Sequence, residues 1–255
     1  CQTLTCFLAD CWMIIPSWLV CLFTEFHVLA ADVPFRFTAL TRSCVVIPCT
    51  FQYPEHVPLT RGIWSKKTGG VIFHKGQSRV LDHFKGRTKI LGDLSKGNCT
   101  LEIDNIKSFD NGPFCFHAER GNDKYRFNNS CVFIVMKASP ATPVMTPVPT
   151  EVDAGSTITV SCSVMHTCSS HPPEFSWSVS NVTSKVTDTS TEQGIWERTS
   201  TITFMVTGRD GVHSLTCTAT FWRGKQQASS VELTVKVLII IILAAVFGVV
   251  ICQKR

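Results

Sequence analysis

The sequence predicts an all-β protein with two β-sandwich domains, and three observations carry this prediction. Short runs rich in β-branched and aromatic residues, such as 130–135 and 200–204, recur between turn residues without a long helical period. Cysteine and tryptophan follow one another in a similar order in each half of the chain. A proline-rich stretch at 140–150 separates the halves and is typical of a stiff linker. The predicted domains are residues 31–139 and 151–236.

The cysteine content indicates an oxidising compartment. The 255 residues include 13 cysteines, and no two of them have the C-x-x-C spacing of a zinc ribbon or a thioredoxin. The positions from Cys44 to Cys217 suit a disulfide framework, which is typical of extracellular proteins. The formal net charge of +5 is mild. It is compatible with anionic glycans or membranes, but solvated lysine and arginine side chains explain it more simply.

The first apolar stretch, residues 11–23, is too short to span a bilayer. It predicts a secretory signal peptide over residues 1–30, cleaved after Ala30 or after the residue that follows it. The chain begins with Cys1, and no basic residue precedes the apolar run. We therefore expect the natural start to be either missing or misassigned. An uncleaved signal anchor is the alternative interpretation.

The second apolar stretch, residues 237–252, predicts a single transmembrane helix. Its 16 residues carry no charge, whereas a bilayer core needs roughly 20 residues. Lys236 and Gln253 can extend the span by snorkelling. The alternative is a buried core helix. Basic residues in the stub 253–255 place it in the cytoplasm, so we expect a single-pass type I plasma-membrane protein with both domains outside the cell.

The second half carries the pattern of an immunoglobulin sandwich. Cys162 is followed by Trp177 and then by Cys217. In that fold the tryptophan packs on a disulfide that joins the two sheets. The pattern therefore predicts a Cys162–Cys217 bridge between sheets.

The first half departs from the same pattern. Cys49 is followed by Trp64, but position 116, where the second cysteine belongs, is phenylalanine. Cys99 lies instead on a predicted strand of the same sheet as Cys49. We expect a Cys49–Cys99 bridge within one sheet, with Phe116 filling the core between sheets that have spread apart.

Four cysteines remain in the extracellular segment. Cys44 has no partner in the first domain and Cys168 none in the second, so a bridge between the domains accounts for both. Cys115 and Cys131 lie on consecutive predicted strands, and a hairpin centred near 122–123 would bring them opposite each other. Their alternatives are free thiols or a bond to another molecule.

This cysteine plan resembles that of the sialic-acid-binding immunoglobulin-like lectins, the siglecs. Four stretches share the resemblance, each weak alone and specific together: 44–49 (CVVIPC), 84–94, 98–101 (NCTL) and 194–196 (GIW). The resemblance covers residues from about 30 to 236. It implies a variable-type N-terminal domain that reads terminal sialic acid, followed by constant-like domains.

The resemblance also implies an arginine whose planar guanidinium forks onto the sialic acid carboxylate. That position is occupied here by His117. If Phe116 points into the core, alternation along the strand places Cys115 and His117 on the outer face. A histidine offers at most one ring N–H to a carboxylate in this geometry, and its charge is lost above about pH 6.5.

The candidate ligand-binding residues are therefore His117, Arg120, Tyr125 and Arg126. The family's second anchor is an aromatic residue on the first strand, and Asp32, at the matching position, would repel a carboxylate. Three interpretations follow: sialic acid binding retained through either arginine or protonated His117, a scaffold whose ligand has changed to a protein or another glycan, or a face without function. Solvated hairpin charges explain both arginines more simply.

Several surface features are expected to serve the fold. N-x-S/T sequons predict glycosylation at Asn98, Asn128 and Asn181. The basic residues between positions 66 and 89 suit an anionic glycan such as heparin, although a solvated loop surface is the simpler explanation. Arg87 and Asp110 are expected to close one end of the first domain with a salt bridge.

The sequence contains no HExxH helix, no GxSxG elbow and no glycine-rich phosphate loop. We therefore predict no catalytic residues, no metal and no cofactor, and we expect no nucleic-acid partner outside the cell. The expected function is siglec-type recognition and adhesion, with sialylated glycans or a cell-surface protein, in cis or in trans, as partner. The alternative is a receptor or decoy that binds a protein through the same face because His117 replaces the arginine.

Overall fold

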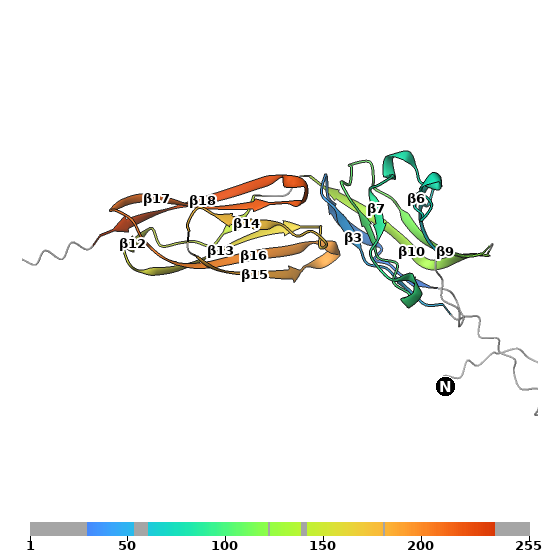
Figure 1. The fold of residues 1–255 in the computed structure, drawn as a ribbon, viewed down its shortest axis with the longest axis horizontal. Coiled ribbons are helices and arrows are strands. Elements are labelled where there is room, and N and C mark those ends of the chain that lie inside the picture. The colour runs from blue at the N-terminus through green and yellow to red at the C-terminus, as the bar shows by residue number, and fades with distance from the viewer. Residues whose placement is uncertain (1–29, 54–60, 122, 139–141, 181, 238–255) are drawn as a thin grey trace, which may run out of the picture.

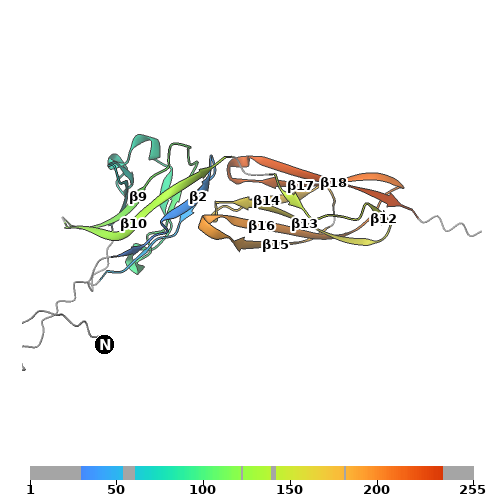
Figure 2. The ribbon, with the colours of Figure 1, turned by 180° about the vertical axis from the view of Figure 1, so that it is seen from behind.

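The computed structural model describes residues 30–53, 61–121, 123–138, 142–180 and 182–237. Two all-β bodies follow one another along the long axis of the molecule, and the chain passes from the first body to the second only once (Figures 1 and 2). The strand β10 ends the first body at Lys137, and β11 begins the second at Val144. Each body is built from facing β-sheets, as the sequence predicts.

The first domain has a five-stranded sheet, a three-stranded sheet and a short two-stranded pair. The five-stranded sheet has the order β2-β10-β9-β5-β6. The other two sheets are β3-β8-β7 and β1-β4. The elements are β1 Ala31–Asp32, β2 Arg36–Leu40, β3 Val45–Ile47, β4 Thr50–Phe51, β5 Arg61–Lys66, β6 Val71–Phe73, η1 Gln77–Arg79, η2 Asp82–Phe84, β7 Thr88–Ile90, η3 Leu94–Lys96, β8 Leu101–Ile103, β9 Phe114–Arg120 and β10 Asp123–Lys137.

The core of the first domain is organised around Phe116 and Trp64, both fully buried. Their ring centroids are 5.7 Å apart, and Phe116 also contacts Phe51 at 5.1 Å. The Trp64 indole N–H donates to the carbonyl of Cys99 at 3.1 Å. Cys99 is bonded to Cys49 within one sheet, where the Cys99 N–H also donates to the Cys49 carbonyl at 2.8 Å. Phe116 therefore occupies the space that a bridge between sheets would cross.

The second domain consists of two four-stranded sheets. Their orders are β11-β13-β16-β15 and β12-β18-β17-β14. Cys162 on the first sheet is bonded to Cys217 on the second, and Trp177 donates its indole N–H to Ser200 at 3.1 Å. The elements are β11 Val144–Met145, β12 Glu151–Asp153, β13 Thr157–His166, β14 Glu174–Trp177, β15 Thr183–Ser190, η4 Glu192–Gly194, β16 Trp196–Met205, β17 Gly211–Thr220, η5 Trp222–Gly224 and β18 Gln226–Lys236.

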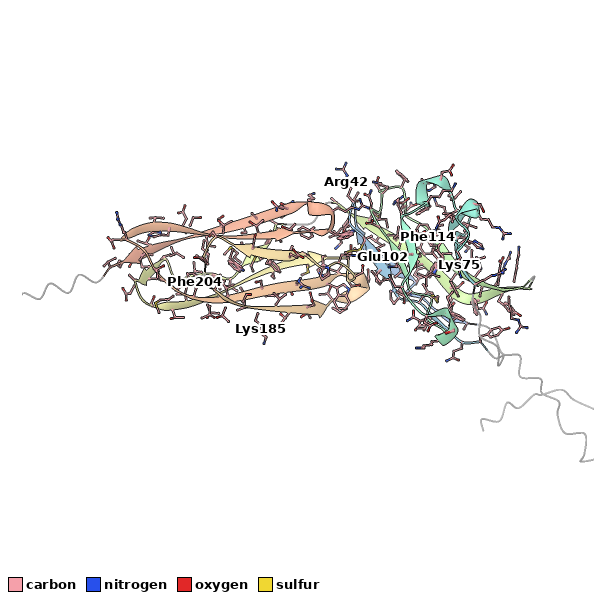
Figure 3. The ribbon with its side chains drawn as sticks, viewed as in Figure 1. Arg42, Lys75, Glu102, Phe114, Lys185 and Phe204 are labelled. Atoms are coloured by element: carbon pink, nitrogen blue, oxygen red, sulfur yellow. A yellow bond between two sulfur atoms is a disulfide. The ribbon has the colours of Figure 1, made fainter. Side chains whose placement is uncertain are left out.

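The two domains are fastened together on one side by covalent and polar contacts. Cys44 is bonded to Cys168 across the junction. The neighbouring Thr167 hydroxyl accepts the Leu40 N–H at 3.1 Å and donates to the Cys44 carbonyl at 3.0 Å. Asp104 of the first domain accepts hydrogen bonds from the second, and Figure 3 places Arg42 at this junction. These contacts fix how the first domain is presented at the end of the second.

A close backbone approach completes the junction. Gly194, with φ of +83°, lies against the ring of Phe37, and a Cβ on that glycine would meet the ring at 2.2 Å. Only glycine has both the left-handed conformation and the missing side chain that this contact requires. The stretch 194–196, one of the four that carry the family resemblance, therefore contributes Gly194 to the contact between domains.

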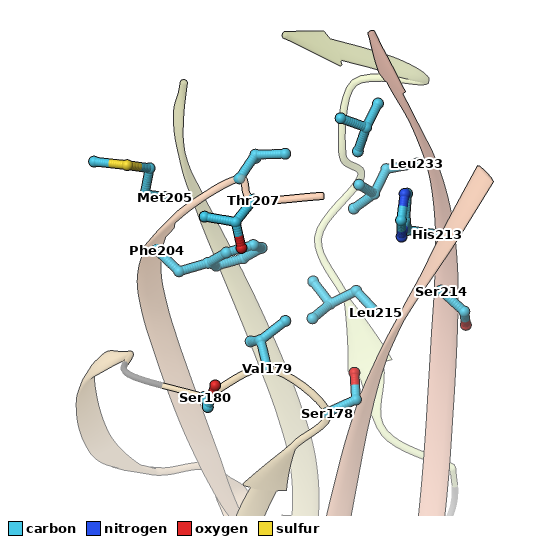
Figure 4. Close-up of a pocket in the computed structure, with 12 residues that line it drawn as sticks. Ser178, Val179, Ser180, Phe204, Met205, Thr207, His213, Ser214, Leu215 and Leu233 are labelled. Atoms are coloured by element: carbon cyan, nitrogen blue, oxygen red, sulfur yellow. The ribbon is translucent and has the colours of Figure 1, made fainter. Parts of the chain in front are cut away.

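The end of the second domain that lies away from the first contains a cavity of about 340 Å³ between its sheets. The cavity is lined by Phe204, Leu215, Leu233 and His213, among others (Figure 4). The imidazole Nε2 of His213 lies 2.8 Å from the Arg209 carbonyl. The first domain closes its corresponding end differently, because Arg87 forms an ion pair there with the fully buried Asp110.

The predicted signal peptide and transmembrane helix lie outside the described residues, apart from Ala30 and Val237. Within the part of the chain that the structure describes, no helix is long and apolar enough to cross a membrane.

Candidate ligand-binding face of the first domain

The five-stranded sheet of the first domain presents an outer face on which β5, β9 and β10 align their side chains in rows. The core residues Trp64 and Phe116 are register partners, so their odd-numbered strand neighbours point outwards. One row contains Ile63, His117 and Arg126. The next row, towards the tip of the β9–β10 hairpin, contains Arg61, Glu119 and Lys124.

His117 sits on this outer face as the sequence predicts, but its surroundings keep it uncharged. Its ring is partly buried, and Nε2 lies 3.0 Å from the Ser65 hydroxyl. Its Nδ1 is buried without a hydrogen-bond partner among the described residues. Burial, and then the nearby Arg126 guanidinium, lower the pKa of His117 below its ordinary value. His117 is therefore neutral near pH 7 and offers no charge to a carboxylate.

Arg126 stands directly opposite His117 on β10. The two residues are register partners on an antiparallel pair, and the side chain of Arg126 is exposed. No carboxylate within the described ranges forms an ion pair with it. Arg126 is thus an exposed guanidinium opposite the position that the resemblance assigns to arginine.

The other two predicted residues, Tyr125 and Arg120, belong to the strand positions that alternate with the outward-facing ones. Tyr125 pairs with the buried Ala118 in the register, and its ring packs edge-on against Tyr53 with centroids 5.1 Å apart. Arg120 pairs with Asp123 at the tip of the hairpin. The structure therefore brings His117 and Arg126 together on the outer face but separates them from Tyr125 and Arg120.

Asp32 lies at the edge of this region. It is exposed on β1, where it pairs with Thr50, and the preceding Ala30 forms a bridge with Asn128 of β10. Its carboxylate is on the strand that runs beside β10, at the place where the resemblance assigns an aromatic side chain.

A disulfide fastens β9 to β10 just below Arg126. Cys115 and Cys131 are register partners and are bonded, with Cα atoms 4.0 Å apart. The register shifts between Arg126 and Cys131, where Asn129 has a φ of +55°. Cys115 is on the outer side of the strand, as alternation predicts, yet it is buried. The bond holds the hairpin that carries the candidate residues. Four disulfides join described residues. The Cys44–Cys168, Cys49–Cys99 and Cys162–Cys217 pairs are those expected from the sequence, and Cys115–Cys131 is one of the alternatives that the sequence left open.

A shallow cup of about 330 Å³ lies at the row of Arg61, Glu119 and Lys124, and no pattern in the sequence indicated it. It joins side chains from β5, from the segment after β6, from η1 and from the hairpin. Arg79 belongs to the basic run noted in the sequence, but Arg61 and Lys124 carry no local signal except their alternation with buried neighbours. The lining residues are Arg61, His74, Arg79, Glu119, Gly121 and Lys124.

Three of the other cations between positions 66 and 89 have partners within the first domain. Arg87 is paired with Asp110, and Lys85 with Asp82 at 2.6 Å. The Lys66 ammonium lies 5.7 Å from the centroid of the Phe84 ring. These three cations therefore contribute to the packing of the first domain.

Two of the three predicted glycosylation positions are described. Asn98 is partly buried, and its side-chain oxygen accepts from the Thr100 N–H at 3.1 Å and the Thr100 hydroxyl at 2.7 Å. Asn128 is exposed beside the irregular part of β10. Asn181 lies outside the described residues.

Comparison with known proteins finds relatives among the myelin-associated glycoproteins and the sialic acid-binding Ig-like lectins. The chain is 30% identical over 206 residues to human myelin-associated glycoprotein, which covers 75% of this chain and 32% of that relative. It is 28% identical over 190 residues to human sialic acid-binding Ig-like lectin 9, covering 70% of this chain and 39% of the relative. The chain belongs to the siglec family. It spans about a third of the length of the first relatives it matches. No family model matches the chain.

Proposed function

We propose that this siglec family member is a cell-surface recognition receptor that binds sialylated glycans through the outer face of its first domain. The observation that carries the proposal is the exposed Arg126, which lies directly opposite position 117 and forms no ion pair with a carboxylate that the structure describes. In this proposal Arg126 receives the sialic acid carboxylate in place of the missing strand β9 arginine. Relatives named for sialic acid binding support the ligand class.

The chemistry of Arg126 suits this role. A guanidinium presents parallel N–H donors that match the two oxygens of a carboxylate, which a neutral histidine cannot do. His117 contributes by position: its neutral ring beside Arg126 adds no competing charge and no counter-ion. An exposed anchor gives modest affinity for one glycan, so we propose that clustered receptors and clustered glycans, in cis or in trans, supply avidity.

The test uses the full chain displayed on transfected cells, with surface level measured through an epitope tag. Binding of a multivalent sialylated probe is compared before and after sialidase treatment of the probe. We expect sialidase to abolish binding, Arg126→Ala to weaken it at least tenfold and Arg126→Lys to restore it in part. Lys185→Ala, on the exposed β15 of the second domain, is the matched control. Sialidase-resistant binding, or full binding by Arg126→Ala, contradicts the proposal.

A protein ligand is the second candidate, and an exposed aromatic pair favours it. Phe35 is 66% exposed and Phe133 39% exposed, with ring centroids 5.1 Å apart. Arg36 lies over the Phe35 ring at 6.0 Å from its centroid. Aromatic residues and arginine are the types enriched in protein interfaces. This candidate predicts sialidase-resistant cell binding that Phe133→Ala abolishes and Arg126→Ala leaves unchanged.

A further inference from the structure

The junction between the two domains contains a pocket of about 390 Å³ that the proposed glycan site does not use. Both domains line this junction pocket, the first with Leu40, Lys137 and Ala138 and the second chiefly with Met165, His166 and Ile195. We propose that the junction pocket binds a small organic acid with an apolar body and a hydroxyl group at the end away from its carboxylate. The inference goes beyond the proposed function and does not depend on it.

The junction pocket has a buried floor and an exposed rim. At the floor, Leu40 is 8% exposed and His166 is 2% exposed. At the rim, Lys137, Ala138 and Met165 are exposed. The side chains of Leu40 and Met165 are apolar, and a flexible methionine adapts to irregular shapes. This gradient suits a ligand whose apolar body lies inside and whose charged group stays at the rim.

The floor offers a polar side chain that the protein leaves unsatisfied. Neither ring nitrogen of His166 has a hydrogen-bond partner among the described residues, and the Asp188 carboxylate oxygen is 3.8 Å from Nε2, beyond hydrogen-bond reach. Unsatisfied buried polar groups are few in native proteins, and each of them calls for an explanation. A ligand atom that pairs with His166 supplies one.

The state of the His166 ring indicates which ligand atom fits. Burial is the largest cause that lowers the pKa of His166, and it outweighs the opposing effect of Asp188. A neutral imidazole has one N–H donor and one bare nitrogen that accepts. A hydroxyl group both donates and accepts, so it pairs with either ring nitrogen. A carboxylate at the floor would instead lose its hydration for a single neutral donor.

The rim supplies a cation for the carboxylate. Lys137 is the last residue of β10, and no carboxylate in the described ranges forms an ion pair with its ammonium group. Its backbone is held in place, because its carbonyl accepts the Thr41 N–H at 3.0 Å and the Thr41 hydroxyl at 2.9 Å. An ammonium group at the mouth of an apolar pocket favours an organic acid over an alcohol or an amine.

The walls of the junction pocket are fixed before a ligand arrives. The Cys44–Cys168 disulfide and the hydrogen bonds of Thr167 fasten the two domains beside it. On the opposite wall, the Ile195 carbonyl accepts the Thr191 N–H at 2.8 Å and the Thr191 hydroxyl at 2.6 Å. A preformed pocket between domains spares a ligand the cost of ordering the protein, which favours binding even of a small molecule.

The test uses the full chain in lipid nanodiscs and saturation-transfer NMR, with empty nanodiscs as the blank. The probes are para-hydroxyphenylacetate, para-hydroxyphenylpropionate and para-hydroxyphenylbutyrate, which differ in length, together with analogues that lack the hydroxyl or carry an alcohol in place of the carboxylate. We expect the best acid to bind with a Kd below about 1 mM. Loss of either polar group should weaken binding about fivefold to tenfold, the effect of one contact.

Four variants connect binding to the junction pocket. Ala138→Trp fills the rim and should abolish binding, whereas Val212→Trp, at a position 66% exposed on β17, is the matched control. Lys137→Gln should remove the preference for the acid over the alcohol. His166→Phe should remove the preference for the hydroxyl. Thermal unfolding of each variant checks its fold, and the exposed Ala138 and Lys137 keep the test decisive if His166→Phe does not fold.

Three outcomes would overturn the inference. The first is that none of the acids gives a signal above empty nanodiscs. The second is that Ala138→Trp binds them as the natural chain does. The third is that the alcohol binds as tightly as the acid. Arg126→Ala should leave binding in the junction pocket unchanged, so failure of the glycan proposal and failure of this inference are told apart.

Discussion

The two domains have their own disulfides at different places in the sandwich. In the second domain Cys162 and Cys217 connect the facing sheets, with Cα atoms 6.6 Å apart. In the first domain Cys49 and Cys99 join neighbouring segments of one sheet, with Cα atoms 4.8 Å apart. A buried phenylalanine fills the gap between sheets that the second domain spans covalently. A sandwich can therefore exchange a bridge between sheets for aromatic packing without losing its closed core.

The same comparison extends to the surfaces. The sheet of the first domain exposes Arg61, Lys124 and Arg126 without carboxylate partners among the described residues. In the second domain Arg198 pairs with Asp188 on the sheet, and Arg223 pairs with Asp104 across the junction. These three cations share one face of a single sheet, whereas the two arginines named in the second domain are held by carboxylates.

The largest expected effect is the loss of Phe116. Phe116→Ala leaves a cavity among Trp64, Phe51 and Phe127, whose rings contact it at centroid distances of 5.7, 5.1 and 5.6 Å. We expect the first domain to lose about 3–5 kcal/mol of stability. Chemical denaturation followed by tryptophan fluorescence measures the change, with Leu215→Ala as the matched core truncation in the second domain. A cost below about 1 kcal/mol would show that Phe116 does not replace the bridge.

Removing each domain's own disulfide sharpens the comparison. The bonded cysteines are separated by 50 residues in the first domain and by 55 in the second. Because the chain-entropy contribution depends on loop length, the double alanine variants should each cost a similar amount, about 2–4 kcal/mol. Differential scanning calorimetry resolves the two domains if they unfold separately. A much larger loss in one domain would mean that native packing around its bridge, rather than loop closure, dominates.

The third prediction concerns Asp104 at the junction, which we expect to contribute about 1 kcal/mol of stability. Burial raises the pKa of Asp104, but hydrogen bonds from Arg223 and Trp222 outweigh it, so the pKa is lower than usual. A carboxylate with a lowered folded-state pKa adds stability above its unfolded pKa, near 3.9, and that stability is lost as the pH falls through the folded value. Asp104→Asn should lower the stability of the junction at neutral pH. The variant should also lose less stability than the natural chain as the pH falls. Small-angle scattering measures how the two domains are held together, and urea titrations at pH 7 and pH 3 measure the stability at each pH. Asp82→Asn is the exposed control.

The smallest expected effect compares one histidine in each domain. Burial lowers the pKa of His117, assisted by Arg126, and burial is also the main cause that lowers the pKa of His166. Between the lowered folded-state pKa and about 6.5 the unfolded chain binds more protons, so stability falls as the pH drops through this range. His117→Gln and His166→Gln should each remove part of that dependence of stability on pH. Unchanged slopes between pH 7 and pH 5 would count against buried neutral rings.

Much of the fold followed from local features of the sequence. The order of cysteines and tryptophans predicted two sandwiches, and the phenylalanine at position 116 predicted which bridge was displaced. The alternation around it also placed His117 on the outer face. The ligand residues were harder to assign, because Arg120 and Tyr125 lie near Arg126 in the chain but on the other side of the strand alternation.

What the sequence by itself determined is therefore the set of features written in periodic or pairwise patterns: strand alternation, the cysteine plan and the exchange of cysteine for phenylalanine. Only the tertiary structure decided which cations form ion pairs and which of the others lie close together. Arg61, Arg79 and Lys124 are far apart in the chain, and the pairing of β5 with β9 and of β9 with β10 brings them to one cup. Strand register depends on the whole core, because a shift of one residue would turn every side chain to the opposite face.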